Sequence, residues 1–119
     1  MKLIAFVFSY SPHGTSFGRE GLDAILGVSA LITKINVFFI GDGVFQLIKN
    51  HKTENILARN YNSAFSILSL YDINNFYCCK KSLKERGIYD NINFILKIKT
   101  VEIDVLRVKL NNCDAIINF

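Results

Sequence analysis

The sequence has few cysteines and no long apolar run, and each of these shortages excludes a class of protein. Its three cysteines, Cys78, Cys79 and Cys113, are odd in number and too few for the disulfide framework of a small secreted domain. The vicinal pair has no second Cys-x-x-Cys and no histidine cluster beside it, so we expect no metal site. No apolar run approaches the ~20 residues that span a bilayer, so we expect no membrane partner.

The first ten residues, MKLIAFVFSY, could pass for the start of a signal peptide. No small-residue cleavage site follows them, because Pro12 and Gly14 end the apolar run. We therefore interpret this segment as a buried first strand and expect a cytoplasmic protein. The net charge of +4 is modest and does not by itself indicate nucleic-acid binding.

The sequence alternates short apolar runs with longer amphipathic segments, which is typical of a doubly wound α/β fold. We predict a single domain over residues 1–119, a three-layer α/β/α arrangement with a mainly parallel, five-stranded sheet. The expected strands are residues 2–9, 36–40, 75–79, 94–100 and 114–119. The expected helices are about 15–33, 62–70, 80–86 and 102–110, with a turn at 41–43 and a short helical turn at 45–48.

In such a fold the loops that follow the strands gather at one edge of the sheet, where ligands bind. Residues 9–15 resemble a phosphate cradle, since Ser11, Gly14 and Thr15 lead into the start of a helix. The loop lacks the Gly-Lys-Ser/Thr of a P-loop and is one residue short of the usual flavodoxin spacing. We expect no cofactor, and a flavin or nucleotide site on these residues stays the weaker alternative.

Cys79 is the candidate reactive residue. It ends a predicted strand and directly precedes a predicted helix, so its sulfur could face free N–H groups and the positive end of the helix dipole. Lys80 and Lys81 add positive charge, and such surroundings favour the thiolate. Because side chains alternate along a strand, Cys78 and Cys79 should point to opposite faces. The alternative is that both are small core residues, and we expect Cys113 to be structural.

Aromatic residues are plentiful, with ten Phe and five Tyr. This is more than we expect the interior of so short a chain to cover, and exposed apolar patches mark association surfaces. We therefore expect oligomerisation and predict an aromatic association surface around Phe38, Phe39 and Phe45.

Several motifs resemble a known family. The segments IAFVFSYSPHGTSFGREGLDAIL, FFIGDGVFQLI and SILSLYDINNFYCCKKSLKERGI, with the terminal DAIINF, are similar to the DsrE/DsrF/DsrH family. The resemblance is to its DsrF-like subunits of bacterial sulfur-relay complexes, and it extends across nearly the whole chain.

The resemblance implies a heterohexamer with TusB-like and TusD-like subunits. Such a complex takes persulfide sulfur from a TusA-like donor and passes it, with a TusE-like partner, towards 2-thiouridine at the tRNA wobble position. The working cysteine of the family generally lies on the TusD-like subunit, at the end of the third strand, and Cys79 occupies the matching place. We therefore expect a non-catalytic or auxiliary subunit without direct tRNA contact. The alternative is a sulfurtransferase in its own right, with Cys79 as the persulfide carrier.

Overall fold

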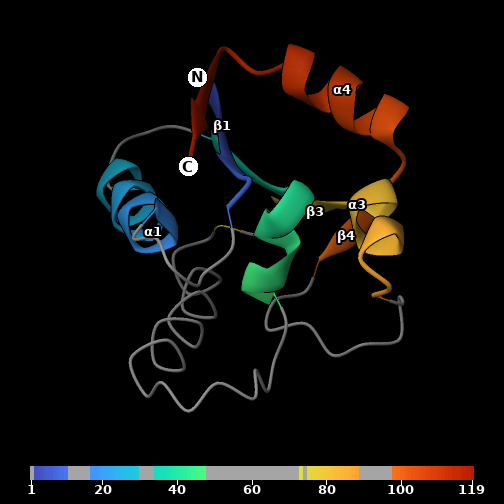
Figure 1. Cartoon of the computed structure of the whole chain (residues 1–119). Helices are drawn as coiled ribbons and strands as arrows, with labels where there is room; N and C mark the ends of the chain where they lie inside the picture. The colour runs from blue at the N-terminus through green and yellow to red at the C-terminus, as the bar shows by residue number, and fades with distance from the viewer. Residues whose placement is uncertain (1, 11–16, 30–33, 48–72, 74, 89–97) are drawn as a thin grey trace.

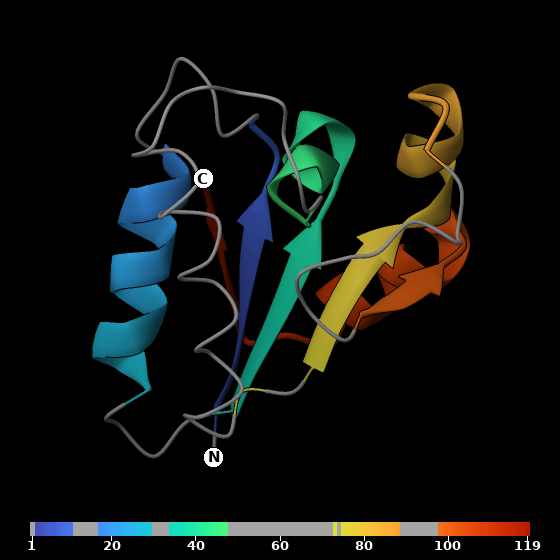
Figure 2. The ribbon, with the colours of Figure 1, turned by 90° about the horizontal axis from the view of Figure 1, so that it is seen from below.

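A parallel β-sheet forms the centre of the molecule (Figures 1 and 2). The computed structural model describes residues 2–10, 17–29, 34–47, 73, 75–88 and 98–119. The strands are β1 (Leu3–Phe8), β2 (Lys34–Phe39), β3 (Asn75–Cys79), β4 (Lys99–Val101) and β5 (Ala115–Asn118), in the order β4-β3-β2-β1-β5. Every neighbouring pair is parallel. The predicted α/β fold class is thus confirmed.

The described helices are α1 (Phe17–Val28), the 3-10 helix η1 (Gly41–Leu47), α3 (Lys80–Glu85) and α4 (Ile103–Asn111). The bounds of α3 and α4 lie within one residue of the predicted helices 80–86 and 102–110. The turn predicted at 41–43 and the helical turn predicted from 45 fall in one continuous 3-10 helix, Gly41–Leu47. Residue 48 of the predicted turn lies outside the described residues. The predicted helix at 62–70 and the first part of the predicted fourth strand, 94–97, lie outside the described residues.

The two faces of the sheet carry separate apolar clusters because side chains alternate along each strand. On one face Phe6, Phe8 and Phe39 pack with Leu22 and Ile25 of α1. We call this the α1-side cluster, and the cluster on the opposite face the α4-side cluster. On the other face a smaller cluster contains Ala5, Val7, Phe38, Tyr77, Cys79 and Leu106, the last from α4. Figure 1 shows α1 and α4 on opposite sides of the sheet, so the three-layer arrangement is as predicted.

The aromatic association surface predicted around Phe38, Phe39 and Phe45 is wrong. Phe38 and Phe39 are fully buried, and Phe45 is partly buried against the α1-side cluster. The reason is topological, since β2 lies between β1 and β3 and a central strand of a parallel sheet is covered on both faces. The sequence pattern could not reveal which strand was central.

Glycines allow η1 to lie directly against the sheet. Gly41 has φ +52°, a conformation that side chains disfavour. At Gly43 a side chain would collide with the carbonyl group of Phe8 at the end of β1. The chain that follows β2 therefore turns tightly over the carboxyl end of β1, which brings η1 beside α3.

Candidate functional site

The carboxyl edge of the sheet collects the described residues that the sequence singled out. Here η1 follows β2, α3 follows β3, and α4 follows β4. Cys79 and Lys80 lie at the β3–α3 junction. The loop residues Ser11, Gly14 and Thr15 lie outside the described residues, so the phosphate-cradle hypothesis stays a prediction.

Cys79 is the last residue of β3 and the N-cap of α3. Its backbone is extended, with φ −73° and ψ 117°, and its side chain makes no capping hydrogen bond. The side chain is 3% exposed and belongs to the α4-side cluster with Phe38 and Leu106. The sulfur is therefore covered by apolar side chains, and a reagent reaches it only if the junction opens.

Cys78 lies on the opposite face of the sheet from Cys79. It is fully buried in the α1-side cluster, and its Sγ lies 3.9 Å from the carbonyl oxygen of Cys79. The predicted alternation of the two cysteines is thus confirmed, and they do not form a vicinal pair on one surface.

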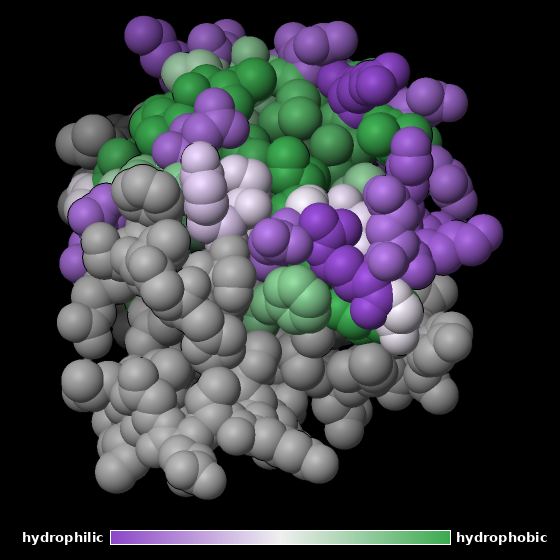
Figure 3. Space-filling model, in the orientation of Figure 1, coloured by the Kyte–Doolittle hydropathy of each residue, from purple (hydrophilic) through white to green (hydrophobic). Residues whose placement is uncertain are grey.

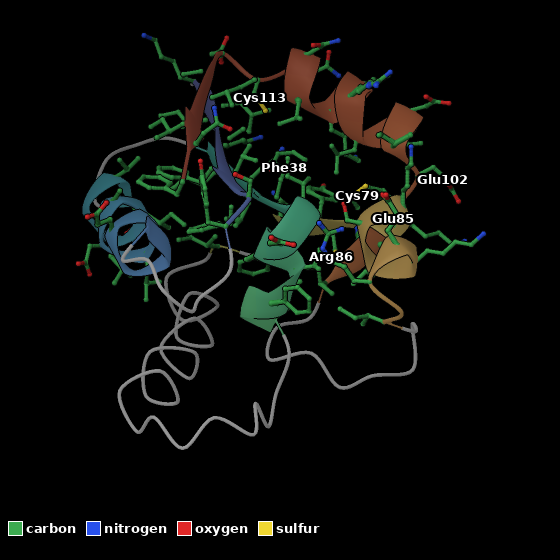
Figure 4. All side chains as sticks on the ribbon, viewed as in Figure 1. Phe38, Cys79, Glu85, Arg86, Glu102 and Cys113 are labelled. Atoms are coloured by element: carbon green, nitrogen blue, oxygen red, sulfur yellow. The ribbon has the colours of Figure 1, made fainter. Side chains whose placement is uncertain are left out.

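The electrostatic surroundings of Cys79 include a residue that the sequence reasoning missed. Glu102 lies between β4 and α4 and is the N-cap of α4. Its Oε1 lies 3.4 Å from Nζ of Lys80. Figure 4 shows Cys79 and Glu102 in the same region of the molecule. The positive charge that Lys80 brings to the junction is therefore partly compensated. No local sequence pattern indicates this pair, because the pair depends on β4 lying next to β3.

A polar network on the other side of α3 ties that helix to η1. The backbone N–H of Gly41 donates to Oγ of Ser82 at 2.9 Å. Nε of Arg86 donates to Oδ1 of Asp42 at 3.0 Å, and its Nη1 donates to the carbonyl oxygen of Ser82 at 3.1 Å. Figure 4 shows Arg86 reaching from the end of α3 to η1. One guanidinium thus contacts two elements that are about 40 residues apart in sequence.

Cys113 lies near the other edge of the sheet, between α4 and β5. Its Sγ donates to the carbonyl oxygen of Lys109 at 3.3 Å. Burial raises the pKa of the Cys113 thiol, the neighbouring Asp114 carboxylate raises it further, and a hydrogen bond with Asn36 opposes both. A thiol in these surroundings is a poor nucleophile at neutral pH. Its expected structural role stays a prediction that this environment favours.

The described residues contain neither a metal-ligand cluster nor a membrane-spanning helix. Among these residues, no three His, Cys, Asp or Glu side chains are grouped so that they could hold a metal ion. None of the helices in the described ranges is both long enough and apolar enough to cross a membrane.

Known proteins match this chain over its whole length. The model of the DsrE/DsrF-like family matches residues 2–119. Protein TusC of Buchnera aphidicola subsp. Schizaphis graminum is 64% identical over 119 residues, which is 100% of both chains. Protein TusC of Escherichia coli O127:H6 is 51% identical, again over 100% of both. The crystal structure of the ychN protein from E. coli has a TM-score of 0.81 with 20% identity and covers 100% of both chains, which indicates a shared fold.

Proposed function

Because this chain belongs to the DsrE/DsrF-like family, we propose that it is an auxiliary, non-catalytic subunit of a cytoplasmic sulfur-relay heterohexamer. The complex would contain TusB-like and TusD-like subunits. It would accept persulfide sulfur from a TusA-like donor and pass it, with a TusE-like acceptor, towards 2-thiouridine at the tRNA wobble position. The full-length similarity to TusC proteins supports this role.

An exposed aliphatic surface on α4 and β5 is the observation that carries the proposal. Val105 and Val108 of α4 and Ile116 and Ile117 of β5 are all exposed, Val108 by 59% and Ile116 by 46%. Figure 3 shows hydrophobic side chains over β5 and the part of α4 nearest to it, bordered by hydrophilic ones. Ile116 is in register with Ala5 on the α4 side of the sheet, whereas Ile117 is in register with Phe6 and faces the α1 side. We name Val105, Val108 and Ile116 the α4–β5 surface. Surfaces of this kind mark protein interfaces.

The position of β5 adds to this argument. Among the described strands it lies at the edge of the sheet next to β1, and all four of its residues are exposed. Open edges that carry apolar side chains are rare in proteins that stay monomeric, because they pair with other chains. A sister subunit that covers β5 and α4 would remove both the open edge and the apolar surface from water.

The burial of Cys79 supports the auxiliary role. A persulfide carrier has to present its sulfur to a donor and then to an acceptor, and exposure governs the reactivity of a thiol. Here the sulfur lies under the α4-side cluster. The working thiol of the relay would then belong to a neighbouring subunit.

Co-expression with the TusB-like and TusD-like subunits tests the proposal. We expect the three chains to elute together from a size-exclusion column in equal amounts, and the chain expressed alone to aggregate or self-associate. If the chain elutes as a stable monomer and does not co-elute with either sister subunit, the proposal is refuted.

One observation favours a second function, namely that Cys79 itself carries sulfur. Cys79 joins a strand to a helix at the edge of the sheet where ligands bind in open α/β folds. Its thiolate would attack the outer sulfur of the donor persulfide, forming a new S–S bond at Cys79 and releasing the donor cysteine as a thiolate. Mass spectrometry after incubation with a sulfur-loaded TusA-like donor distinguishes the two functions. A gain of one sulfur atom at Cys79 supports this second function, and an unmodified thiol excludes it.

A further inference from the structure

The helix that begins at Cys79 depends on tertiary contacts for its position. Helix α3 has only six residues, Lys80–Glu85, and isolated helices shorter than about 12 residues are marginal in water. It buries two side chains, Ser82 and Leu83. Leu83 supplies apolar contact in the α1-side cluster, but a single apolar side chain leaves the direction of so short a helix poorly defined. The polar contacts of α3 must therefore fix that direction.

Those polar contacts lie at the two ends of α3 and differ in strength. At the start, Lys80 pairs with Glu102, but the two side chains are 54% and 68% exposed, and such surface pairs contribute little. At the end, the Arg86 side chain is 25% exposed and that of its partner Asp42 is 60% exposed. Arg86 makes charge-assisted hydrogen bonds to the Asp42 carboxylate and to the Ser82 carbonyl, and bonds of this kind are the stronger ones.

We propose that Asp42 and Arg86 are positioning residues for Cys79. The Arg86 guanidinium holds α3 against η1, and the Gly41 N–H holds the buried Ser82 hydroxyl in the same contact. Because the helix is a continuous hydrogen-bonded unit, a fixed Ser82 and Arg86 also fix the orientation of its N-cap, Cys79. Strand alternation places the sulfur on the α4 face. The contact keeps α3 closed over the β3–α3 junction, and its loss opens that junction. The positioning of Cys79 does not depend on either proposed function. Its relevance to sulfur transfer rests on the second proposed function, in which Cys79 itself carries sulfur.

Site-resolved alkylation of the full-length chain with iodoacetamide tests this inference. Tandem mass spectrometry follows the modification of Cys79 and of Cys113 in the same molecules. We compare Asp42→Ala and Arg86→Ala with Lys84→Ala, which changes an exposed cation of the same helix. We expect Cys79 to react about three- to tenfold faster in the first two variants, as the loss of one partly buried charged pair allows. Cys113 should react at the unchanged rate in all three.

Two further variants separate positioning from general stability. Asp42→Asn keeps an acceptor oxygen in the same place and should raise the rate less than Asp42→Ala. Arg86→Lys can reach only one of the two partners and should give an intermediate rate. The double variant Asp42→Ala/Arg86→Ala should react no faster than the faster single variant, because both changes break one contact.

An unchanged Cys79 rate in the folded alanine variants overturns the inference. So does a parallel rise at Cys79 and Cys113, since that pattern indicates global destabilisation. If an alanine variant does not fold, Asp42→Asn and Arg86→Lys make the same comparison with a smaller change. The reagent needs neither a sulfur donor nor a sister subunit, so a negative result here leaves both proposed functions standing.

Discussion

Cys79 of β3 and Val101 of β4 are register partners at the ends of two adjacent parallel strands. Each strand leads directly into a helix, so the residues that follow, Lys80 and Glu102, are brought within 3.4 Å of one another. The ion pair is thus a consequence of strand register, and it lies beside the junction that carries the candidate thiol.

Removal of this ion pair should have a small, salt-dependent effect on stability. We expect Glu102→Gln to lower the free energy of unfolding by less than about 1 kcal/mol at low salt, because both partners are largely exposed. The difference should vanish in about 1 M salt, where such charges are screened. Urea denaturation at the two salt concentrations measures both values. Glu85→Gln, an exposed carboxylate of α3, is the matched control. A loss of several kcal/mol would show that the pair is far less exposed than described.

Gly43 and Gly27 should respond to alanine in opposite directions. At Gly43 the added methyl group collides with the Phe8 carbonyl group, so we expect Gly43→Ala to cost more than about 2 kcal/mol or to prevent folding. At Gly27, within α1, nothing lies near the added atom. Gly27→Ala should therefore stabilise the protein by about 0.5–1 kcal/mol, because alanine is the better helix former. Thermal and urea unfolding measure the two changes, and a neutral Gly43→Ala would contradict the close approach of η1 to β1.

The reactivity of Cys113 should depend on the charge of Asp114. Burial and the Asp114 carboxylate both raise the pKa of the Cys113 thiol. Loss of that negative charge in Asp114→Asn lowers the pKa, so at a given pH more of the thiol is ionised. We expect the pH profile of Cys113 alkylation to move to lower pH in this variant. Asp104→Asn, at an exposed position of α4, should leave the profile where it was. A shift to higher pH in Asp114→Asn would have the wrong sign for this account.

Charge on the α4–β5 surface should prevent assembly with the sister subunits. We expect Val108→Lys and Ile116→Lys to fold normally, because both side chains are exposed, but to lose co-elution with the TusB-like and TusD-like chains. A lysine buried in an apolar interface is strongly unfavourable. Glu85→Lys introduces the same side chain at an exposed position of α3, which follows β3 and lies away from β5, and serves as the control. If all three variants co-elute like the parent chain, another surface forms the interface.

The sequence predicted the layers of the fold better than it predicted the surfaces. The alternation of apolar runs located β3 at its observed bounds, and Gly87 marked the end of α3 with a φ of +68°. The order of the strands is not encoded in any local pattern. For that reason the sequence could not tell that Phe38 and Phe39 lie in a central strand and are buried.

The sequence predicted only those features of the candidate site that depend on residues adjacent in the chain. The position of Cys79 at a strand end follows from neighbouring residues, and so does the opposite orientation of Cys78. Glu102 and Asp42 could not be predicted, because each reaches the β3–α3 region through a different strand or loop. The role of Arg86, at the end of α3, depends on its contact with Asp42 and could not be predicted either. Contacts between residues about 20–40 positions apart depend on which strands are neighbours, and only the structure supplies that.

We propose that this chain contributes an association surface, and not sulfur chemistry, to the relay complex. The most direct measurement is the 2-thiouridine content of tRNA in cells whose own copy of the gene is replaced by a variant. We expect Cys79→Ser to retain near-normal 2-thiouridine and Ile116→Lys to lose most of it. Loss of 2-thiouridine with Cys79→Ser in a complex that still assembles, together with a normal level in Ile116→Lys, would contradict this proposal.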